Sequence, residues 1–91
     1  MYVSITSSKF KKDLRHANKR NKNLSKIQNI MEKLTEGDSL SIRNNDHSLT
    51  GNYSGRRECH IEPDWLLIYK IDLDAMEIIF ERTGTHSDLF T

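Results

Sequence analysis

The sequence lacks several features that common functional sites and cellular locations require. A single cysteine, Cys59, excludes a disulfide within the chain and a zinc site of four thiolates, which favours a reducing compartment. No run approaches the roughly 18 apolar residues of a membrane span, and residues 1–10 contain no positive region followed by an apolar signal core. The sequence has no glycine-rich phosphate loop either. We therefore expect a soluble, cytoplasmic chain without a membrane segment.

The chain is short, and its charge is unevenly distributed. Its 91 residues suit a single domain spanning 1–91, which can bury about 60–65% of the surface of the unfolded chain. The net charge is only +1, but residues 9–26 contain eight Lys and Arg against one Asp, a local charge of +7 that leaves −6 elsewhere. Such a basic segment is typical of a surface for phosphates or an acidic protein, although it can also serve only to keep a helix in solution.

The N-terminal part of the chain predicts one strand and two helices. Apolar and polar residues alternate over residues 2–6, as in a short strand. Ser7 or Ser8 can cap the first helix, and Gly37 supplies a stop signal for the second. Apolar residues recur at helical spacing in both: Phe10, Leu14 and Ala17, then Leu24, Ile27, Ile30, Met31 and Leu34.

The rest of the chain predicts a loop and three strands. Residues 38–55 are polar and predict a long loop. Strands are expected over residues 56–62, 65–72 and 76–83, and the middle one, WLLIYKI, is apolar on both faces and therefore central. We expect an α+β fold in which two N-terminal helices pack on one face of a small, mainly antiparallel four-stranded sheet.

The stretch HIEPDW ends one predicted strand and contains several titratable groups. Pro63 at the second place of a four-residue turn presets its φ, so the chain should reverse tightly there. His60 and Asp64 should then face each other across the end of a hairpin. A helical His-x-x-x-Asp metal pair is excluded because the proline would remove a hydrogen bond of that helix. We expect neither a metal site nor a cofactor.

Other titratable groups lie in two further polar segments. His47 lies in DHSLTG, residues 46–51, and Arg82 and His86 lie in ERTGTHSDLF, residues 81–90. In the last segment Gly84 permits a turn, and two apolar residues could pin the tail that carries the histidine to the core. The remaining histidine, His16, lies in the basic helix and should be solvated.

Histidine, carboxylate and arginine together suit metal-free cleavage of RNA. Such a site takes a proton from the 2′-hydroxyl, stabilises charge at phosphorus and protonates the departing 5′-oxygen. Histidine can serve either proton transfer, and arginine suits the phosphate. By this logic Arg82 is the electrostatic clamp, His86 a proton donor, and His60 with Asp64 the base side or its support.

Each of these residues also has a plain structural interpretation. Loop histidines are often surface decoration, Asp64 can serve turn geometry alone, and Arg82 can form a surface ion pair with Glu81 or Glu62. Trp65, Tyr69 and Cys59 are expected to be packing residues. The residue types alone leave these alternatives open.

Three motifs taken together resemble a known family. DHSLTG, then RRECHIEPDWLLIYKI, then FERTGTHSDLF closely resemble the YafQ type of toxin in the RelE/ParE superfamily of bacterial type II toxin–antitoxin modules. The motifs cover about the C-terminal half of the chain, and the N-terminal half matches in layout. The resemblance implies a RelE-like fold and a metal-independent, ribosome-dependent endonuclease, an mRNA interferase that cuts message in the decoding site and inhibits translation.

The resemblance also implies roles for individual residues. His86 would be the general acid and Arg82 the charge stabiliser, while Phe90 would support the nucleotide. His47, His60 and Asp64 would supply the base side and contacts to phosphate or base.

The resemblance further implies partners. Lys11, Lys12 and Arg15 in the basic helix would contact ribosomal RNA while the site addresses the message. A cognate antitoxin would neutralise the toxin by wrapping it with a C-terminal segment. Two alternatives are a non-catalytic ParE-like toxin acting on gyrase and a plain RNA-binding module.

Overall fold

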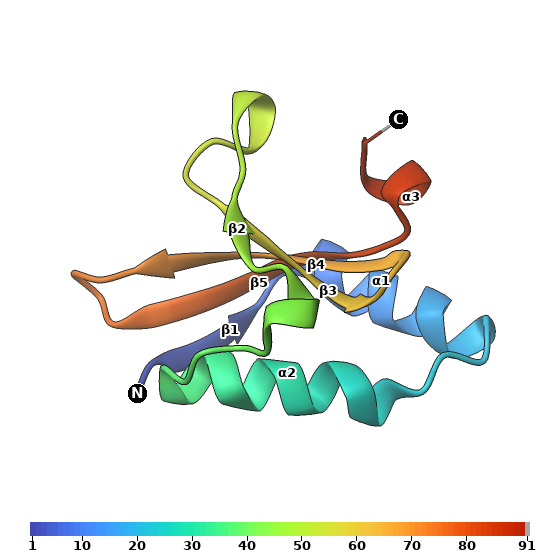
Figure 1. Ribbon diagram of the computed structural model, residues 1–91, viewed down its shortest axis with the longest axis horizontal. Helices are drawn as coiled ribbons and strands as arrows, with labels where there is room; N and C mark the ends of the chain where they lie inside the picture. The colour runs from blue at the N-terminus through green and yellow to red at the C-terminus, as the bar shows by residue number, and fades with distance from the viewer. Residues whose placement is uncertain (91) are drawn as a thin grey trace.

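The structure, a computed structural model, describes residues 1–90 and confirms the predicted α+β class (Figure 1). The predicted order of a strand, two helices and then strands is also confirmed. The elements in chain order are β1 (Val3–Thr6), α1 (Ser8–Lys19), α2 (Leu24–Glu36), η1 (Ile42–Asn44), β2 (His47–Ser48), η2 (Gly51–Tyr53), β3 (Arg57–Glu62), β4 (Trp65–Asp72), β5 (Glu77–Gly84) and α3 (His86–Phe90), where η denotes a 3₁₀ turn.

The sheet has the strand order β1-β5-β4-β3-β2, with β1 parallel to β5 and the other neighbours antiparallel. The apolar strand β4 is central, as predicted. The prediction of four strands is wrong by one, because β2 forms within the segment that was expected to be a loop. It consists of two residues, which is too short for an alternating pattern to reveal.

Local signals determine where the two long helices begin and end. The Ser7 side chain caps α1 by accepting a hydrogen bond from the backbone N–H of Phe10 at 3.0 Å. Asn23 caps α2 in the same way through the N–H of Ser25. Gly37 ends α2 with φ of 83°, a left-handed conformation that glycine adopts without steric cost.

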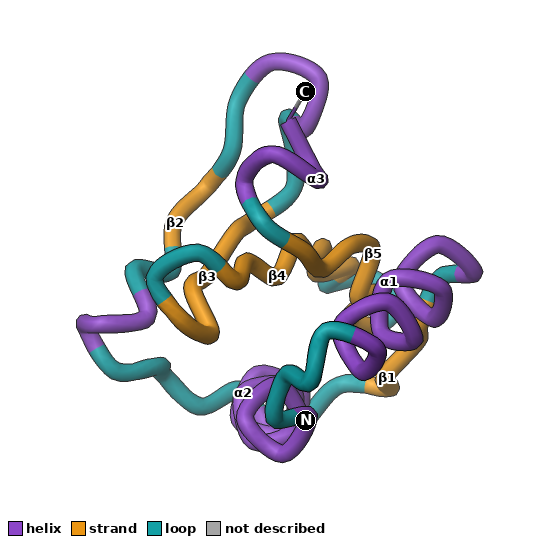
Figure 2. The backbone as a smooth tube through the Cα atoms, turned by 90° about the vertical axis from the view of Figure 1, so that its right-hand side faces the viewer, coloured by secondary structure: helices purple, strands orange, loops and turns teal. Residues whose placement is uncertain are grey.

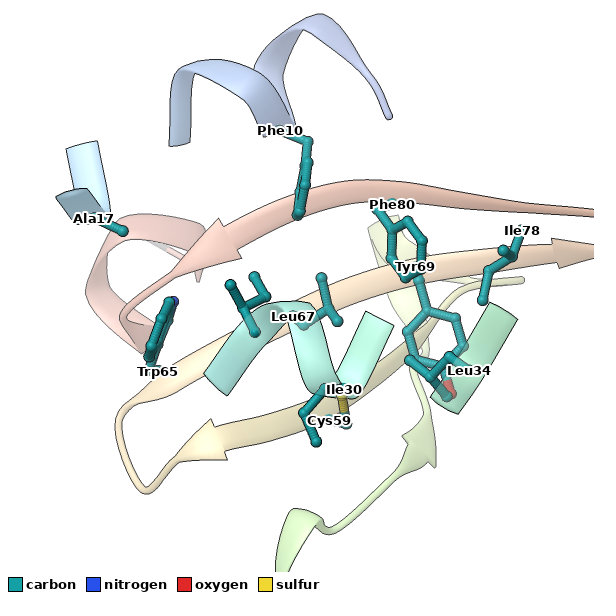
Figure 3. Close-up of a cluster of buried hydrophobic side chains, with 11 residues drawn as sticks. Phe10, Ala17, Ile30, Leu34, Cys59, Trp65, Leu67, Tyr69, Ile78 and Phe80 are labelled. Carbon is teal, nitrogen blue, oxygen red and sulfur yellow. The ribbon is translucent and has the colours of Figure 1, made fainter. Parts of the chain in front are cut away.

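One face of the sheet, the helix face, is covered by α1 and α2 and contains the main core (Figures 2 and 3). Figure 3 shows side chains of both helices meeting those of the central strands. The buried members of this cluster are Phe10, Ala17, Ile27, Ile30, Leu34, Cys59, Trp65, Leu67, Tyr69, Ile78 and Phe80. Trp65, Tyr69 and Cys59 are therefore packing residues, as expected.

The opposite face of the sheet, the open face, carries a smaller cluster. Leu66 and Ile68 of β4 alternate with the core residues of that strand and pack against Leu89 of α3. Figures 1 and 2 show α3 and the segment around η2 on this side, away from α1 and α2. This smaller cluster leaves most of the open face to other side chains.

None of the helices in the part of the chain that the structure describes has the length and apolarity needed to cross a bilayer.

Candidate functional site

Strand register places four polar site residues on the open face. Residues directly opposite each other in an antiparallel ladder share a face, so the apolar Leu66 and Ile68 identify the side chains that lie beside them. The pairs are His60 with Leu66, Glu58 and Arg82 each with Ile68, and His47 with Glu58. The four polar residues, contributed by β2, β3 and β5, thus lie on one surface around the apolar residues of β4.

A β-bulge is what brings Arg82 to the open face. Phe80 pairs with Tyr69 and Arg82 pairs with Ile68, so Glu81 is an extra residue in β5. In an uninterrupted strand Phe80 and Arg82 would share the helix face, because side chains alternate with a period of two. The bulge reverses the alternation and leaves Phe80 in the core while Arg82 faces away from it.

His47 and His60 gather around a carboxylate that the sequence analysis did not single out, that of Glu58. The distances from Glu58 Oε2 are 3.2 Å to His47 Nε2 and 3.8 Å to His60 Nε2. The two imidazole centroids are 6.5 Å apart. Glu58 is only 6% exposed, and its Oε1 has no hydrogen-bond partner among residues 1–90. Burying a carboxylate that lacks a hydrogen bond costs free energy. Its presence between two histidines therefore indicates a functional role.

Hydrogen bonds to backbone carbonyls fix the orientation of both imidazoles. His47 Nδ1 lies 2.7 Å from the Asn45 carbonyl oxygen, and His60 Nδ1 lies 3.2 Å from that of Pro63. A carbonyl oxygen only accepts, so each Nδ1 carries the proton and each Nε2 is directed toward Glu58. The Glu58 carboxylate therefore lies against the Nε2 side of both rings, at 3.2 Å from His47 and 3.8 Å from His60.

A pattern in β3 could have revealed Glu58. Cys59 was expected to point to the apolar face, so Glu58 and His60 on either side of it must point to the other face together. A carboxylate two residues from a histidine on a polar strand face is a weak signal by itself. The contact with His47 comes from a strand pairing that the sequence did not predict.

Asp46, the acidic residue directly before His47, has a structural role. Its carboxylate accepts hydrogen bonds from the Tyr69 hydroxyl and from Arg57 Nε at 3.3 Å. These bonds hold the chain against β3 and β4 immediately before β2. Asp46 thus supports the position of His47 from outside the site.

The C-terminal segment forms a short helix, α3, instead of an extended tail. Thr85 and Asp88 bond each other's backbone N–H groups through their side chains at 3.0 and 3.1 Å, which is a capping box. Gly84 lets α3 approach closely, since a Cβ there would lie 3.0 Å from the Asp88 Cβ, a tight contact. Leu89 is pinned to the core as expected, but Phe90 is 37% exposed, so the prediction is wrong for that residue.

Asp64 contacts His86 instead of the His60 side chain that it was expected to face. Asp64 Oδ1 accepts a hydrogen bond from the backbone N–H of His86 at 3.1 Å, while His60 bonds the Pro63 carbonyl. The turn thus links the β3–β4 hairpin to the start of α3. Both side chains of that link, Asp64 and His86, are exposed.

Three rings form a continuous row beside the open face. The Phe90 ring lies 4.8 Å from the His86 imidazole and 5.3 Å from the Tyr53 ring, measured between centroids. The Tyr53 hydroxyl donates a hydrogen bond to the Leu89 carbonyl oxygen at 3.2 Å. Planar rings at a partly exposed surface can support a nucleic-acid base.

Arg82 pairs with Asp13 of α1, and not with Glu81 or Glu62. Arg82 Nε and Nη2 lie 2.8 and 3.3 Å from the two carboxylate oxygens of Asp13. The hydrogen bond that Arg82 donates to Asp13 is the main reason that the pKa of Arg82 is raised. Glu81 pairs with Arg56, and Glu62 with Lys22 and Lys26.

The basic segment divides into internally paired and exposed residues. Lys22, Lys26 and Arg20 form ion pairs within the fold, the last with Asp88 at 2.8 Å. Lys11, Lys12 and Arg15 are exposed on α1, as is His16. Part of the predicted basic surface therefore stabilises the fold, and part remains available to a partner.

No cluster of three or more His, Cys, Asp and Glu within residues 1–90 has the arrangement needed to hold a metal ion. Burial raises the pKa of the Cys59 thiol to about 12, which keeps it protonated.

Comparison with known proteins places the chain in a family. Residues 2–91 match the family described as bacterial toxin of type II toxin–antitoxin system, YafQ. The chain is 41% identical over 85 residues to the mRNA interferase toxin YafQ of Escherichia coli strain K12, an alignment that covers 92% of this chain and 90% of that protein.

Solved structures agree with this similarity. The crystal structure of YafQ from Escherichia coli BL21(DE3) superimposes with a TM-score of 0.93 at 37% identity, covering all of both chains. An Escherichia coli DinJ–YafQ toxin–antitoxin complex matches with a TM-score of 0.89 at 38% identity, covering 99% and 98% of the chains. A metal-bound toxin from Helicobacter pylori matches with a TM-score of 0.93 at 36% identity, covering 99% and 100%.

The shared fold and a sequence match over nearly the whole length lead to one assignment: the chain belongs to the YafQ family of bacterial toxins of type II toxin–antitoxin systems.

Proposed function

We propose that this protein is an endoribonuclease that cleaves message on the ribosome without a metal ion. The observation that carries the proposal is the open face, where strand register gathers two histidines, a carboxylate and an arginine beside the helix that holds His86. The name mRNA interferase given to the relative from Escherichia coli supports it.

The base side of the reaction is the group of His47, Glu58 and His60. Cleavage begins when a base removes the proton of the ribose 2′-hydroxyl, so that the oxygen attacks the adjacent phosphorus. Each histidine directs Nε2 toward the same carboxylate. The Nε2 of His60 lies 3.8 Å from Glu58 Oε2, beyond hydrogen-bond distance, so it can accept the proton of the 2′-hydroxyl while the carboxylate stabilises the imidazolium that forms.

The acid side is formed by Arg82 and α3. Arg82 compensates the charge that develops on the phosphoryl oxygens, and His86 donates a proton to the departing 5′-oxygen. Asp64 fixes the backbone of His86 through its N–H, so its role is to position the acid. Phe90, in contact with His86, supports the base of the bound nucleotide.

The exposed lysines and arginine of α1 bind ribosomal RNA. Lys11, Lys12 and Arg15 carry charges that project to solvent, and such groups supply salt-dependent affinity for phosphates. Changing Lys11 and Lys12 to Glu should weaken ribosome association and flatten its dependence on salt. The rate of cleavage at saturating ribosome should change little.

A cognate antitoxin is the second partner. The related toxin of Escherichia coli forms a complex with DinJ, and this chain covers nearly all of that toxin's fold. Neutralisation of this protein would follow from a comparable complex.

The test is expression of wild type and of His86→Ala in growing cells, with mapping of the 5′ ends of messages. Cuts in frame with codons, present only with wild type, are expected. Equal cutting by the variant would refute the assigned acid.

The metal-independent mechanism is tested with EDTA-treated toxin and programmed ribosomes, because a metal-bound structure exists for the relative from Helicobacter pylori. Since magnesium holds the ribosome together, the toxin alone is treated with the chelator and then exchanged into assay buffer. Unchanged cleavage is expected. Loss that zinc or copper restores would overturn the metal-free step.

A further inference from the structure

Arg82 can stabilise a phosphate only if its guanidinium is held in one orientation. A free arginine side chain has many rotamers, and orienting a catalytic group before the reaction lowers the barrier substantially. The structure provides a partner for this purpose on α1. Asp13 engages the Nε edge of the guanidinium with both carboxylate oxygens, at 2.8 and 3.3 Å.

Asp13 is itself fixed to the strand that carries Arg82. The pairing of β1 with β5 ends at Thr6 and Phe80, so the edge of β5 beyond that point is not covered by β1. Asp13 Oδ2 accepts a hydrogen bond from the backbone N–H of Thr83 at 3.1 Å there. The carboxylate therefore binds the side chain of one residue and the backbone of the next, directly after the bulge.

The charge of Asp13 runs against that of its surroundings. It is the single acid between Lys9 and Lys26, in a segment that otherwise carries eight positive charges. A carboxylate at this place weakens attraction for RNA, and because both side chains of the ion pair are partly buried, the cost of removing their charges from water offsets much of what the pair adds to stability. The contacts of Asp13 with the Arg82 side chain and the Thr83 backbone instead indicate that it orients Arg82.

We propose that Asp13 is a positioning residue that orients Arg82 so that the unpaired edge of the guanidinium meets the phosphate. This inference rests on the proposed function. The Nη1 group is not engaged by Asp13 and is the group offered to substrate, and Tyr53 also interacts with the guanidinium.

The first test is Asp13→Asn in a cleavage assay on programmed ribosomes, with kcat and KM measured separately. The amide oxygen of Asn can still accept the Thr83 N–H, so the fold is preserved while the charge is lost. We expect kcat to fall about 10–100-fold, as for a misplaced catalytic group. KM should stay equal or decrease, because a negative charge near the RNA has been removed.

The control variants separate orientation from charge and from folding. Glu32→Gln makes the same charge change on the exposed surface of α2 and should leave kcat unchanged. Asp13→Glu keeps the carboxylate and should restore part of the rate. Thermal unfolding of each variant gives the folded fraction, and rates are compared per folded molecule.

A double-mutant cycle decides whether Asp13 acts through Arg82. In an Arg82→Ala background, Asp13→Asn should cause no further fall in kcat. A fall of the same size in both backgrounds, or an unchanged kcat for Asp13→Asn alone, would overturn the proposal. If Arg82→Ala itself leaves cleavage intact, the proposed role of Arg82 fails instead, so the two failures can be told apart.

Discussion

The two faces of the sheet differ in how many buried apolar side chains and how many titratable side chains they carry. Within residues 1–90 the helix face holds eleven buried apolar side chains, among them Phe10, Trp65 and Phe80, in one continuous cluster. The open face has three buried apolar residues in the same range, and Glu58, His60 and Arg82 lie beside two of them. One face supplies most of the apolar burial, and the other supplies the chemistry.

This division teaches that the site depends on the core without sharing residues with it. The open face tolerates a buried carboxylate and an exposed phenylalanine because the burial on the helix face stabilises the fold independently. Substitutions on the two faces should therefore have opposite signatures, one in rate and the other in stability.

The largest effect on rate is expected from His86→Ala. Loss of the proton donor should lower cleavage roughly 10²–10⁴-fold, equivalent to about 3–5 kcal/mol of barrier. The melting temperature should hardly change, because His86 is exposed. Single-turnover cleavage together with thermal unfolding checks both. A variant that cuts normally, or one that unfolds, would break the distinction between the faces.

The largest effect on stability is expected from Phe10→Ala. The ring is fully buried and packs 6.0 Å from that of Phe80, so its removal leaves a cavity in the main core. Unfolding free energy should fall by about 3–5 kcal/mol. Urea denaturation measures it. At low temperature, cleavage per folded molecule should equal that of wild type, and a lower value would mean that the core also tunes the site.

An intermediate effect is expected from Glu58→Gln. The amide keeps the shape but removes the negative charge beside His47 and His60, so the rate should fall by about 10–100-fold. Stability should hold or rise, since a buried carboxylate with an unpaired oxygen is removed. The shape of the pH–rate profile should change as well. An unchanged profile would show that the carboxylate serves structure alone.

The smallest expected effect is that of Asp88→Asn on the stability of the fold at acid pH. The hydrogen bond from Arg20, followed by that from the Thr85 backbone, holds the pKa of Asp88 well below its usual range. A carboxyl whose pKa is lower in the folded state stabilises the fold above its unfolded pKa, near 4, and this contribution is lost as pH falls toward the folded value. Asp88→Asn should therefore show a weaker loss of stability between about pH 4 and 2, followed by circular dichroism. Equal acid sensitivity would mean that α3 is held by Leu89.

Three kinds of feature could be predicted from the sequence. The helices followed from apolar spacing and from caps such as Ser7 and Gly37, and the central strand from its apolar run. The family followed from three motifs, which also identified His47, His60, Asp64, Arg82, His86 and Phe90 as candidates. What these signals share is that each is local along the chain.

The remaining features depend on contacts between distant segments. The two-residue strand β2 exists because His47 and Ser48 pair with β3. The partner of Arg82 lies 69 residues earlier in the sequence, and that of the His86 backbone lies in another turn. Spacing along the chain does not specify such pairs.

The sequence by itself determined which side chains this protein can use and which segments are helical or central in the sheet, because propensity, capping and hydrophobic periodicity act over a few residues. Only the tertiary structure decided that the bulge at Glu81 turns Arg82 toward the open face and that Glu58 lies between two histidines. Strand register and bulges arise from packing between strands, and a shift of one residue exchanges the two faces of a sheet.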